Sequence, residues 1–344
     1  MRPIRYPACL AALLLSLNFA HAAPLPFGEL PTGADSQQVT VAGISSGAMM
    51  AVQMHVALSA KIRAIAAFAG GVYACGRGDF ATLRRCAHPQ QEADIPLPQL
   101  LAETRARAQR GAIDPVAGLA RSRVYLFTGA NDGLIVPAVG RQLQAFYRQL
   151  MPEAPPEAIV LNEDPLANHA WISPDATQGC AEYGGQWINN CGDDPQADYL
   201  KLFYGPLQKR AVAPLSGQLI RFSQAPFADG QPATRGLADE GFAYIPRACS
   251  ASGNGCRVHL ALHGCMMSSQ DLGDSFVRLS GINPWADSNR IIVVYPQARP
   301  SDSNPRGCWD VWGIHDAAYD TKTGGQMRFF AALIAHLTRQ QTAQ

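Results

Sequence analysis

The sequence predicts an α/β fold in which a mostly parallel central sheet is flanked by helices. Two observations lead to this prediction. Short apolar, strand-like runs alternate with helical segments along most of the chain, and a Gly-x-Ser-x-Gly turn lies between the first strand and the first helix. Alternation of this kind is typical of parallel sheets, in which a helix carries the chain back between neighbouring strands.

The first half supplies four expected strands and three expected helices. The strands are 38–43, 65–68, 124–128 and 158–161, and the helices are 48–59, 98–109 and 139–151. Each strand is a short apolar run, and the helix at 48–59 has apolar residues at helical spacing. The turn with Ser45 therefore lies between a strand and a helix.

The second half begins after a polar, cysteine-bearing stretch at 168–198. Further strands are expected at 218–222, 242–245, 258–263 and 291–295, and a last helix at 326–337. Residues 211–217 are the one soft boundary and are equally consistent with a loop. Because the chain has no repeat and no low-complexity linker, we expect residues 23–344 to form a single domain without a separate substrate-binding domain.

The N-terminus has the pattern of a cleavable export signal. Arg2 and Arg5 precede an apolar run at 8–19, which is followed by the small-x-small tripeptide Ala20-His21-Ala22. The run is shorter than the ~20 residues that span a bilayer, and no later segment is long and apolar enough to do so. A lipoprotein anchor at Cys9 is the weaker alternative, because Cys9 lies inside the apolar run. We expect cleavage after Ala22 and a secreted or periplasmic protein without a membrane anchor.

Charge argues against polyanionic partners. The chain has 28 Lys and Arg and 27 Asp and Glu, and removing Arg2 and Arg5 leaves 26 against 27, a formal charge of −1. Nucleic-acid and anionic-membrane binding favour strong positive patches. With 16% charged residues, the surface suits a neutral substrate.

Cysteine usage indicates disulfides. Nine cysteines become eight without Cys9, and an even count in an exported chain favours bridges over metal ligands. Eight cysteines allow about 105 pairings, so the sequence does not fix them. Three pairs lie close in sequence, leaving a fourth; the four are Cys75–Cys86, Cys180–Cys191, Cys249–Cys256 and Cys265–Cys308. The chain has no Cys-x-x-Cys, and His259 and His263 would stand about 13 Å apart on a strand, so we expect no metal and no cofactor.

Ser45 is the expected nucleophile. Gly43-Ile44-Ser45-Ser46-Gly47 has the form of a nucleophile elbow, in which glycines allow a strained turn that lifts the serine hydroxyl clear of the sheet. The alternative is an ordinary Gly-Ser turn. The helix that follows offers a positive dipole and the free backbone N–H of Ser46 to a developing oxyanion.

A serine nucleophile needs a base and an orienting acid. Asp132 lies in the loop that leaves the strand at 124–128, and His169 lies in a loop after the next strand. In hydrolases with this elbow the acid and the histidine follow the serine in that order. Among the rivals, His55, His259 and His336 lie in expected helices or strands, His88 lies in a polar loop just past Cys86, and Asp175 and Asp194 follow His169. His315, in a late loop after Trp312, is the strongest rival.

The run His263-Gly264-Cys265 closes a late strand. His-Gly at the end of a strand is a common way to present the second oxyanion donor, here the N–H of Cys265. That element usually precedes the nucleophile strand, so the order predicts a circular permutation, with the last helix placed just before the strand at 38–43. The alternative is that His263 only caps its strand.

These motifs resemble a known family. The runs 43–50, 262–265 and 307–310 resemble the extracellular and periplasmic poly(3-hydroxybutyrate) depolymerases with the serine motif near the N-terminus, over nearly the whole mature chain. Secreted feruloyl and acetylxylan esterases share the His-Gly-Cys and Cys-Trp motifs in unpermuted order. The resemblance implies a circularly permuted, disulfide-stabilised α/β-hydrolase fold.

For the site, the resemblance implies Ser45, Asp132 and His169 as catalytic triad, the N–H groups of Ser46 and Cys265 as oxyanion hole, and a Cys265–Cys308 bridge. The implied reaction is hydrolysis of poly(3-hydroxybutyrate) or its oligomers by a monomeric serine esterase. Four aromatic residues near the motifs are candidates for contact with an aliphatic polyester, although tryptophans beside disulfides often simply pack on them; they are Trp309, Trp171, Trp312 and Tyr73. The alternatives are a feruloyl- or acetylxylan-type esterase and, from another class, a catalytically silent hydrolase-like binding protein.

Overall fold

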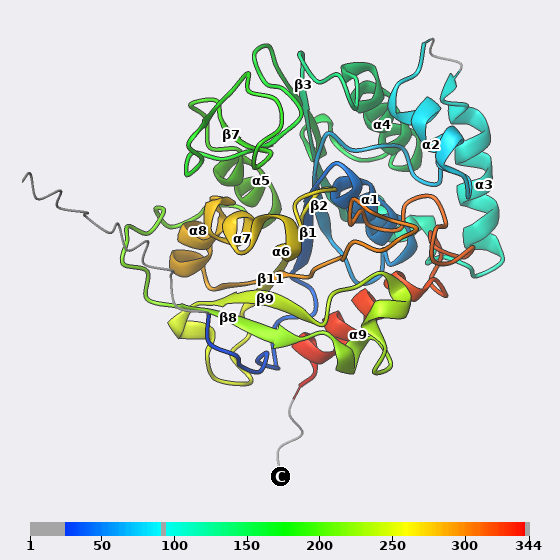
Figure 1. Cartoon of the computed structure of the whole chain (residues 1–344). Helices are drawn as coiled ribbons and strands as arrows, with labels where there is room; N and C mark the ends of the chain where they lie inside the picture. Colours follow the sequence, from blue (N-terminus) through cyan, green and yellow to red (C-terminus); the bar gives the residue numbers. More distant parts are fainter. Residues whose placement is uncertain (1–24, 91–93, 341–344) are drawn as a thin grey trace, which may run out of the picture.

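The computed structural model describes residues 25–90 and 94–340, so the expected signal peptide at 1–22 lies outside the described residues. One eight-stranded sheet runs through the molecule in the order β4-β3-β2-β1-β10-β11-β9-β8 (Figure 1). Its strands are β1 (Val39–Ile44), β2 (Ala64–Phe68), β3 (Arg123–Gly129), β4 (Ile159–Asp164), β8 (Gln218–Ser223), β9 (Glu240–Ile245), β10 (Arg257–Leu262) and β11 (Ile291–Tyr295).

The six strands from β4 to β11 in this order are parallel to one another, while β9 pairs antiparallel with β11 and β8 antiparallel with β9. The predicted mostly parallel sheet is therefore confirmed, and each expected strand is present. Because the sheet contains strands from before and after residues 211–217, that segment is a connecting loop.

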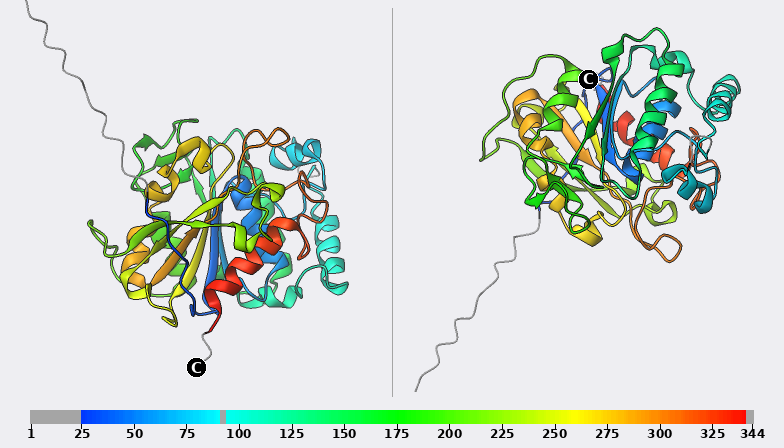
Figure 2. Two further views of the ribbon diagram at one scale, coloured as in Figure 1. Left: turned by 60° about the horizontal axis from the view of Figure 1, so that its bottom comes forward. Right: turned by 90° about the horizontal axis from the view of Figure 1, so that it is seen from above.

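Helices cover both faces of the sheet. α1 (Ser46–Ala57), α3 (Leu97–Gln109), α4 (Pro137–Leu150) and α9 (Gly325–Thr338) lie on one side, and α5 (Pro195–Tyr204), α7 (Ser275–Leu279) and α8 (Ile282–Asn289) lie on the other (Figure 1). The view from above shows the sheet as a layer between them (Figure 2). Every residue of α1 is buried, because this helix fills the space between the sheet and the outer helices.

Smaller elements surround one edge of the sheet. They are the helices α2 (Phe80–Ala87) and α6 (Ser269–Leu272) and a three-stranded sheet of β5 (Trp171–Ile172), β7 (Ile188–Asn190) and β6 (Gln178–Gly179). The sequence did not predict α2, α5, α6, α7, α8 or the small sheet.

The permuted order of the chain is visible in the pairing. β10 comes more than 200 residues after β1 but lies beside it, with Val39 opposite Val258. The last helix ends next to the chain that leads into β1, since the backbone N–H of Ala34 donates to the carbonyl of Leu337 at 2.9 Å. Both placements match the sequence prediction.

Four disulfides brace the loops, and all four expected pairs are confirmed: Cys75–Cys86, Cys180–Cys191, Cys249–Cys256 and Cys265–Cys308. Among the described residues, none of the helices combines the length and the apolar character that crossing a bilayer requires.

Two histidines belong to the core. The His55 ring bonds the hydroxyls of Tyr147 and Ser122 at 3.0 and 2.9 Å, and His259 Nδ1 lies 2.8 Å from Thr40 Oγ1. Burial lowers the pKa of each to about 3, so both rings are neutral near pH 7.

Candidate active site

Ser45 lies at a sharp turn between β1 and α1. Its backbone has φ 57° and ψ −121°, a conformation that costs a non-glycine residue energy and is typical of functional turns. The flanking glycines are required by close approach: a Cβ on Gly43 would lie 2.3 Å from the carbonyl oxygen of Gly47, and a Cβ on Gly47 would lie 2.4 Å from that of His263. The turn therefore packs directly against the end of β10.

Asp132 and His169 form a buried pair on the loops that follow β3 and β4. His169 Nδ1 lies 2.8 Å from Asp132 Oδ2, and the two residues are 5% and 3% exposed. Asp132 Oδ1 accepts the backbone N–H groups of Leu134 and Ile135, each at 2.8 Å. These bonds fix the carboxylate, which in turn fixes the imidazole and leaves Nε2 as the ring nitrogen for proton transfer.

The loop after β10 lies against the nucleophile, since a Cβ on Gly264 would be 3.4 Å from Ser45 Cβ. His263 Nε2 accepts the backbone N–H of Ala298 at 3.0 Å, so Nδ1 carries the proton and donates to the carbonyl of Gly264 at 2.7 Å. Burial lowers the pKa of His263 to about 4, which keeps this ring neutral. The Cys265–Cys308 bridge ties the same loop to residues 304–308. His263 is thus a brace for the peptide that carries the Cys265 N–H.

Ser45, Ser46, His169 and Cys265 all line one pocket with a volume of about 600 Å³. Its walls are mainly apolar, and they come from α1, α2, the loop after Asp132, Trp187 just before β7, and the loops after β10 and β11. The apolar wall residues are Met49, Phe80, Leu83, Ala87, Leu134, Ile135, Trp187, Met266, Met267, Pro305, Val311, Trp312 and Ile314. A volume and lining of this kind suit a small, mostly apolar ligand.

Of the four aromatic residues expected to contact substrate, Trp312 alone lines this pocket, where its ring meets that of Phe80 edge-on at 5.5 Å. The expectation is wrong for Trp309 and Trp171, which are fully buried. Trp309 Nε1 donates to the carbonyl of His263 at 2.9 Å, so this ring packs behind the start of the loop after β10. Trp171 Nε1 donates to the carbonyl of Ser280 in the same way.

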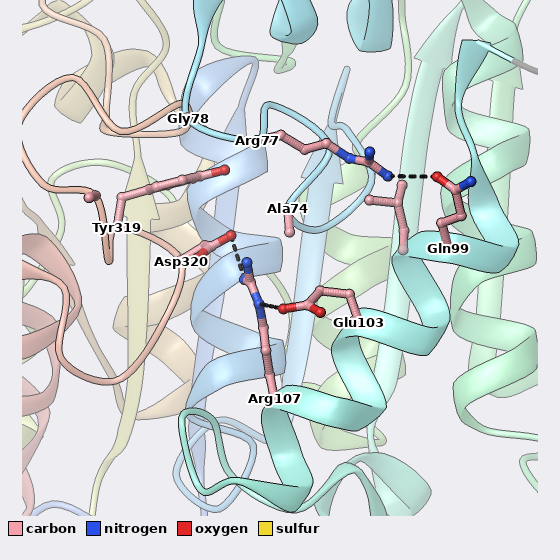
Figure 3. A pocket seen from close by; sticks show the side chains of 10 residues that line it. Ala74, Arg77, Gly78, Gln99, Glu103, Arg107, Tyr319 and Asp320 are labelled. Atoms are coloured by element: carbon pink, nitrogen blue, oxygen red, sulfur yellow. Dashed lines mark hydrogen bonds and ion pairs between the residues drawn. The ribbon is translucent and has the colours of Figure 1, made fainter.

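The expectation is also wrong for Tyr73, which belongs to a polar network beside α3. Its hydroxyl donates to the carbonyl of Asp320 at 2.6 Å and accepts from Arg107 at 3.1 Å. Figure 3 shows that Arg107 also pairs with Glu103 and the Asp320 carboxylate, at 2.8 and 2.6 Å, in a hollow of about 460 Å³. This hollow shares no lining residue with the pocket at Ser45, and its charged groups neutralise one another.

The rival residues have other roles. His315 is half-buried against Gly236 and does not line the pocket, and His336 Nε2 lies 3.1 Å from the carbonyl of Leu30. Asp175 pairs with Arg210, and Asp194 caps α5. His88 lies in the loop after α2 and does not line the pocket.

Several residues that line the pocket were not predicted from the sequence. Trp187 stands edge-on to the His169 ring at 5.9 Å, and Leu134 and Phe80 are 40% and 53% exposed at the pocket. A signal was available for two of them: Leu134 follows Asp132 closely, and Trp187 lies inside the Cys180–Cys191 loop near His169. Phe80 had none, because it lies far in sequence from each of the catalytic motifs.

No protein-family model matches the chain. Two curated proteins are similar to it. The poly(3-hydroxybutyrate) depolymerase of Delftia acidovorans is 38% identical over 305 residues, 87% of this chain and 59% of that protein. The polyhydroxybutyrate depolymerase of Talaromyces funiculosus is 32% identical over 314 residues, 84% of this chain and 86% of that protein. The chain thus matches about three fifths of the first relative and most of the second.

Solved structures give the same assignment. The crystal structure of the PHB depolymerase from Penicillium funiculosum has a TM-score of 0.83 at 29% identity and covers 91% of this chain and 100% of that chain. A structure of a PHB depolymerase serine-to-alanine variant complexed with R3HB trimer gives the same values. From the permuted sheet, the pocket at the nucleophile turn and these similarities, it follows that the chain belongs to the polyhydroxybutyrate depolymerase family.

Proposed function

We propose that this protein is a serine esterase that hydrolyses poly(3-hydroxybutyrate) or its oligomers to 3-hydroxybutyrate units through an acyl-enzyme on Ser45. The observation that carries the proposal is the convergence of four groups in one pocket. They are the strained Ser45, the His169 ring held by Asp132, and the backbone N–H groups of Ser46 and Cys265.

In the proposed reaction, His169 Nε2 takes the Ser45 proton as Oγ attacks the ester carbonyl. The N–H groups of Ser46 and Cys265 bind the oxyanion, and Asp132 stabilises the imidazolium. Collapse transfers the proton to the leaving alcohol, which is the hydroxyl of the next monomer, and leaves a 3-hydroxyacyl enzyme. Water activated by His169 then releases the acid, and no step needs a cofactor.

Two features support an aliphatic polyester substrate. The pocket walls are mainly apolar, which suits a chain of methyl and methylene groups between ester bonds. The two curated relatives carry depolymerase names, and a related structure holds an R3HB trimer. Three aromatic residues, Trp312, Phe80 and Trp187, line this pocket and are our candidates for contact with such a chain.

The disulfides fit a secreted protein, because such bridges persist in oxidising compartments. We further propose cleavage after Ala22, release to the periplasm or the medium, and a monomeric single catalytic domain. N-terminal sequencing of exported protein tests the cleavage site, and light scattering tests the oligomeric state. A mature protein that still begins at Met1, or a stable dimer, would contradict these points.

The central experiment compares wild-type protein with Ser45→Ala. We expect a serine-directed organophosphate to label only the wild type at Ser45, and Ser45→Ala to lose hydrolysis of short p-nitrophenyl esters while keeping its melting temperature. Release of 3-hydroxybutyrate from amorphous granules and soluble oligomers is then measured beside ferulate release from a feruloylated sugar. Activity on the sugar ester alone would contradict the proposed substrate, and a folded wild type that is neither labelled nor active would favour a binding protein.

A further inference from the structure

Two arginines are the charged exceptions in the active-site pocket. Arg84 on α2 and Arg306 in the loop after β11 both line it, and no Asp or Glu is among its lining residues. Apart from His169, every other side chain that lines the pocket is neutral. Two arginines therefore border a mainly apolar space that also contains Ser45.

Within the described parts of the chain, neither guanidinium makes an ion pair or a side-chain hydrogen bond. Many other arginines do; examples are Arg110 with Glu103, Arg141 with Glu163, and Arg278 with Asp274. Asp302, on the same loop as Arg306, does not line the pocket. Among the residues that the structure describes, these two positive charges thus have no counter-ion.

Both arginines extend from well-fixed backbone. α2 is capped at its start by Asp79, whose carboxylate accepts the N–H of Thr82 at 2.7 Å, and is bridged at its end by Cys75–Cys86. The carbonyl of Arg306 accepts the N–H of Met266 at 2.7 Å, next to the oxyanion loop. The two side chains therefore approach the pocket from separate, anchored segments.

We propose that Arg84 and Arg306 bind the terminal carboxylate of a short oligoester, so that the pocket selects chain ends and oligomers over interior ester bonds. This inference rests on the proposed function. The interior of the polyester is neutral, whereas every hydrolysed fragment carries one carboxylate. In an oligomer that carboxylate stays on the alcohol fragment that leaves Ser45, and a guanidinium fork matches its geometry.

The effect should be moderate and sensitive to salt. Both arginines are exposed, so solvent screens their charge, and a rim charge acts mainly on association and binding. We expect about a three- to tenfold preference in kcat/KM for a free carboxylate at low salt. The preference should shrink above about 0.5 M salt, where the Debye length is only a few ångströms.

The test compares the 3-hydroxybutyrate trimer with its methyl ester, which carries the same ester bonds without the charge. The proteins are wild type, Arg84→Gln, Arg306→Gln and the double variant. Arg85→Gln is the matched control: it removes the same charge from the same helix, but Arg85 does not line the pocket and bonds Thr82 Oγ1. Binding of both ligands is also measured calorimetrically in a Ser45→Ala background, where no turnover occurs.

The expected result is a wild-type preference for the free acid that falls towards unity in the double variant, mainly through KM and Kd, and is retained in Arg85→Gln. The inference would be overturned if the wild type had equal kcat/KM and Kd for the acid and the methyl ester. It would also be overturned if the preference for the acid were unchanged in the double variant. Failure to hydrolyse either compound would refute the proposed function instead. In that case the calorimetric difference between acid and methyl ester still decides whether the arginines bind a carboxylate.

Discussion

Replacing Gly47 with alanine tests the contact between the nucleophile turn and the oxyanion loop. An added Cβ would lie 2.4 Å from the carbonyl oxygen of His263 and 2.5 Å from that of Leu262. Both are backbone atoms at the end of β10, so no side-chain rotation relieves the clash. Because ordinary contact begins near 3.4 Å, either the turn or the end of β10 must move by about 1 Å.

The expected loss is larger in catalysis than in stability. Overpacking of this kind costs about 1–3 kcal/mol of unfolding free energy, part of which is offset by the better helix propensity of alanine at the start of α1. An oxyanion donor must lie within about 2.7–3.1 Å of the oxygen, and losing one lowers kcat by about 10²–10³. A 1 Å shift of the Cys265 N–H relative to Ser45 is therefore expected to lower kcat by about two orders of magnitude with little change in KM.

The assay is steady-state hydrolysis of p-nitrophenyl butyrate, with thermal unfolding measured in parallel. Gly133→Ala is the control, because it lies next to Asp132 but an added Cβ there meets nothing within 4 Å. We expect that control to retain kcat and melting temperature. A Gly47→Ala protein with wild-type kcat would show that the end of β10 does not position the oxyanion donor, which would refute the reasoning.

Three further predictions follow from the same region and from the core. Trp309→Phe removes the N–H that satisfies the buried carbonyl of His263, so we expect a loss of about 1–3 kcal/mol in urea unfolding and a lower kcat; an unchanged protein would show that the bond is dispensable. The Cys265–Cys308 bridge joins two residues that are 43 positions apart in sequence. Replacing both cysteines with serine should lower the free energy of unfolding by about 4 kcal/mol and also lower kcat. Full activity would show that the disulfide does not position the loop. Burial lowers the pKa of His55 from 6.5 to about 3. Below pH 6.5 the unfolded chain therefore binds a proton at His55 that the native protein does not bind, and the free energy of unfolding decreases as the pH is lowered. His55→Gln should remove about 1.4 kcal/mol per pH unit from that slope between pH 6 and 4, and an identical slope would contradict the assignment.

The sheet was predictable because its inner strands are short apolar runs that are buried on both faces. The expected strand at 291–295 matches β11, and the others differ from the observed bounds by a few residues. The segment 168–198 was not predictable in this way. Its small sheet is held by the Cys180–Cys191 bridge and by bonds from the Asn189 amide to the carbonyls of Cys180 and Glu182. Such contacts leave no periodic pattern in a sequence.

The errors on aromatic residues have a related cause. Trp309 lies between Cys308, which forms the disulfide with Cys265, and Asp310, whose carboxylate accepts backbone N–H groups from residues 313–316. Closeness to a motif in sequence placed Trp309 near the site, but it did not show which side of the loop its ring occupies. Its ring faces the core, where it contacts His263 and Phe330.

The clustering of the proposed site residues was predictable for a reason that does not extend to the pocket walls. Ser45, Asp132, His169 and Cys265 follow the carboxyl ends of β1, β3, β4 and β10, and parallel strands bring those ends to one edge of the sheet. Their meeting therefore depends on topology, which the alternation of strands and helices already encodes. The walls come instead from α2, from Trp187 in the loop before β7 and from the loop at 303–314, whose positions depend on disulfides and single hydrogen bonds. Since substrate choice depends on the walls, substitutions at Arg84, Arg306 and Trp312 should change which ester is preferred, whereas substitution of Ser45 should abolish hydrolysis of every ester.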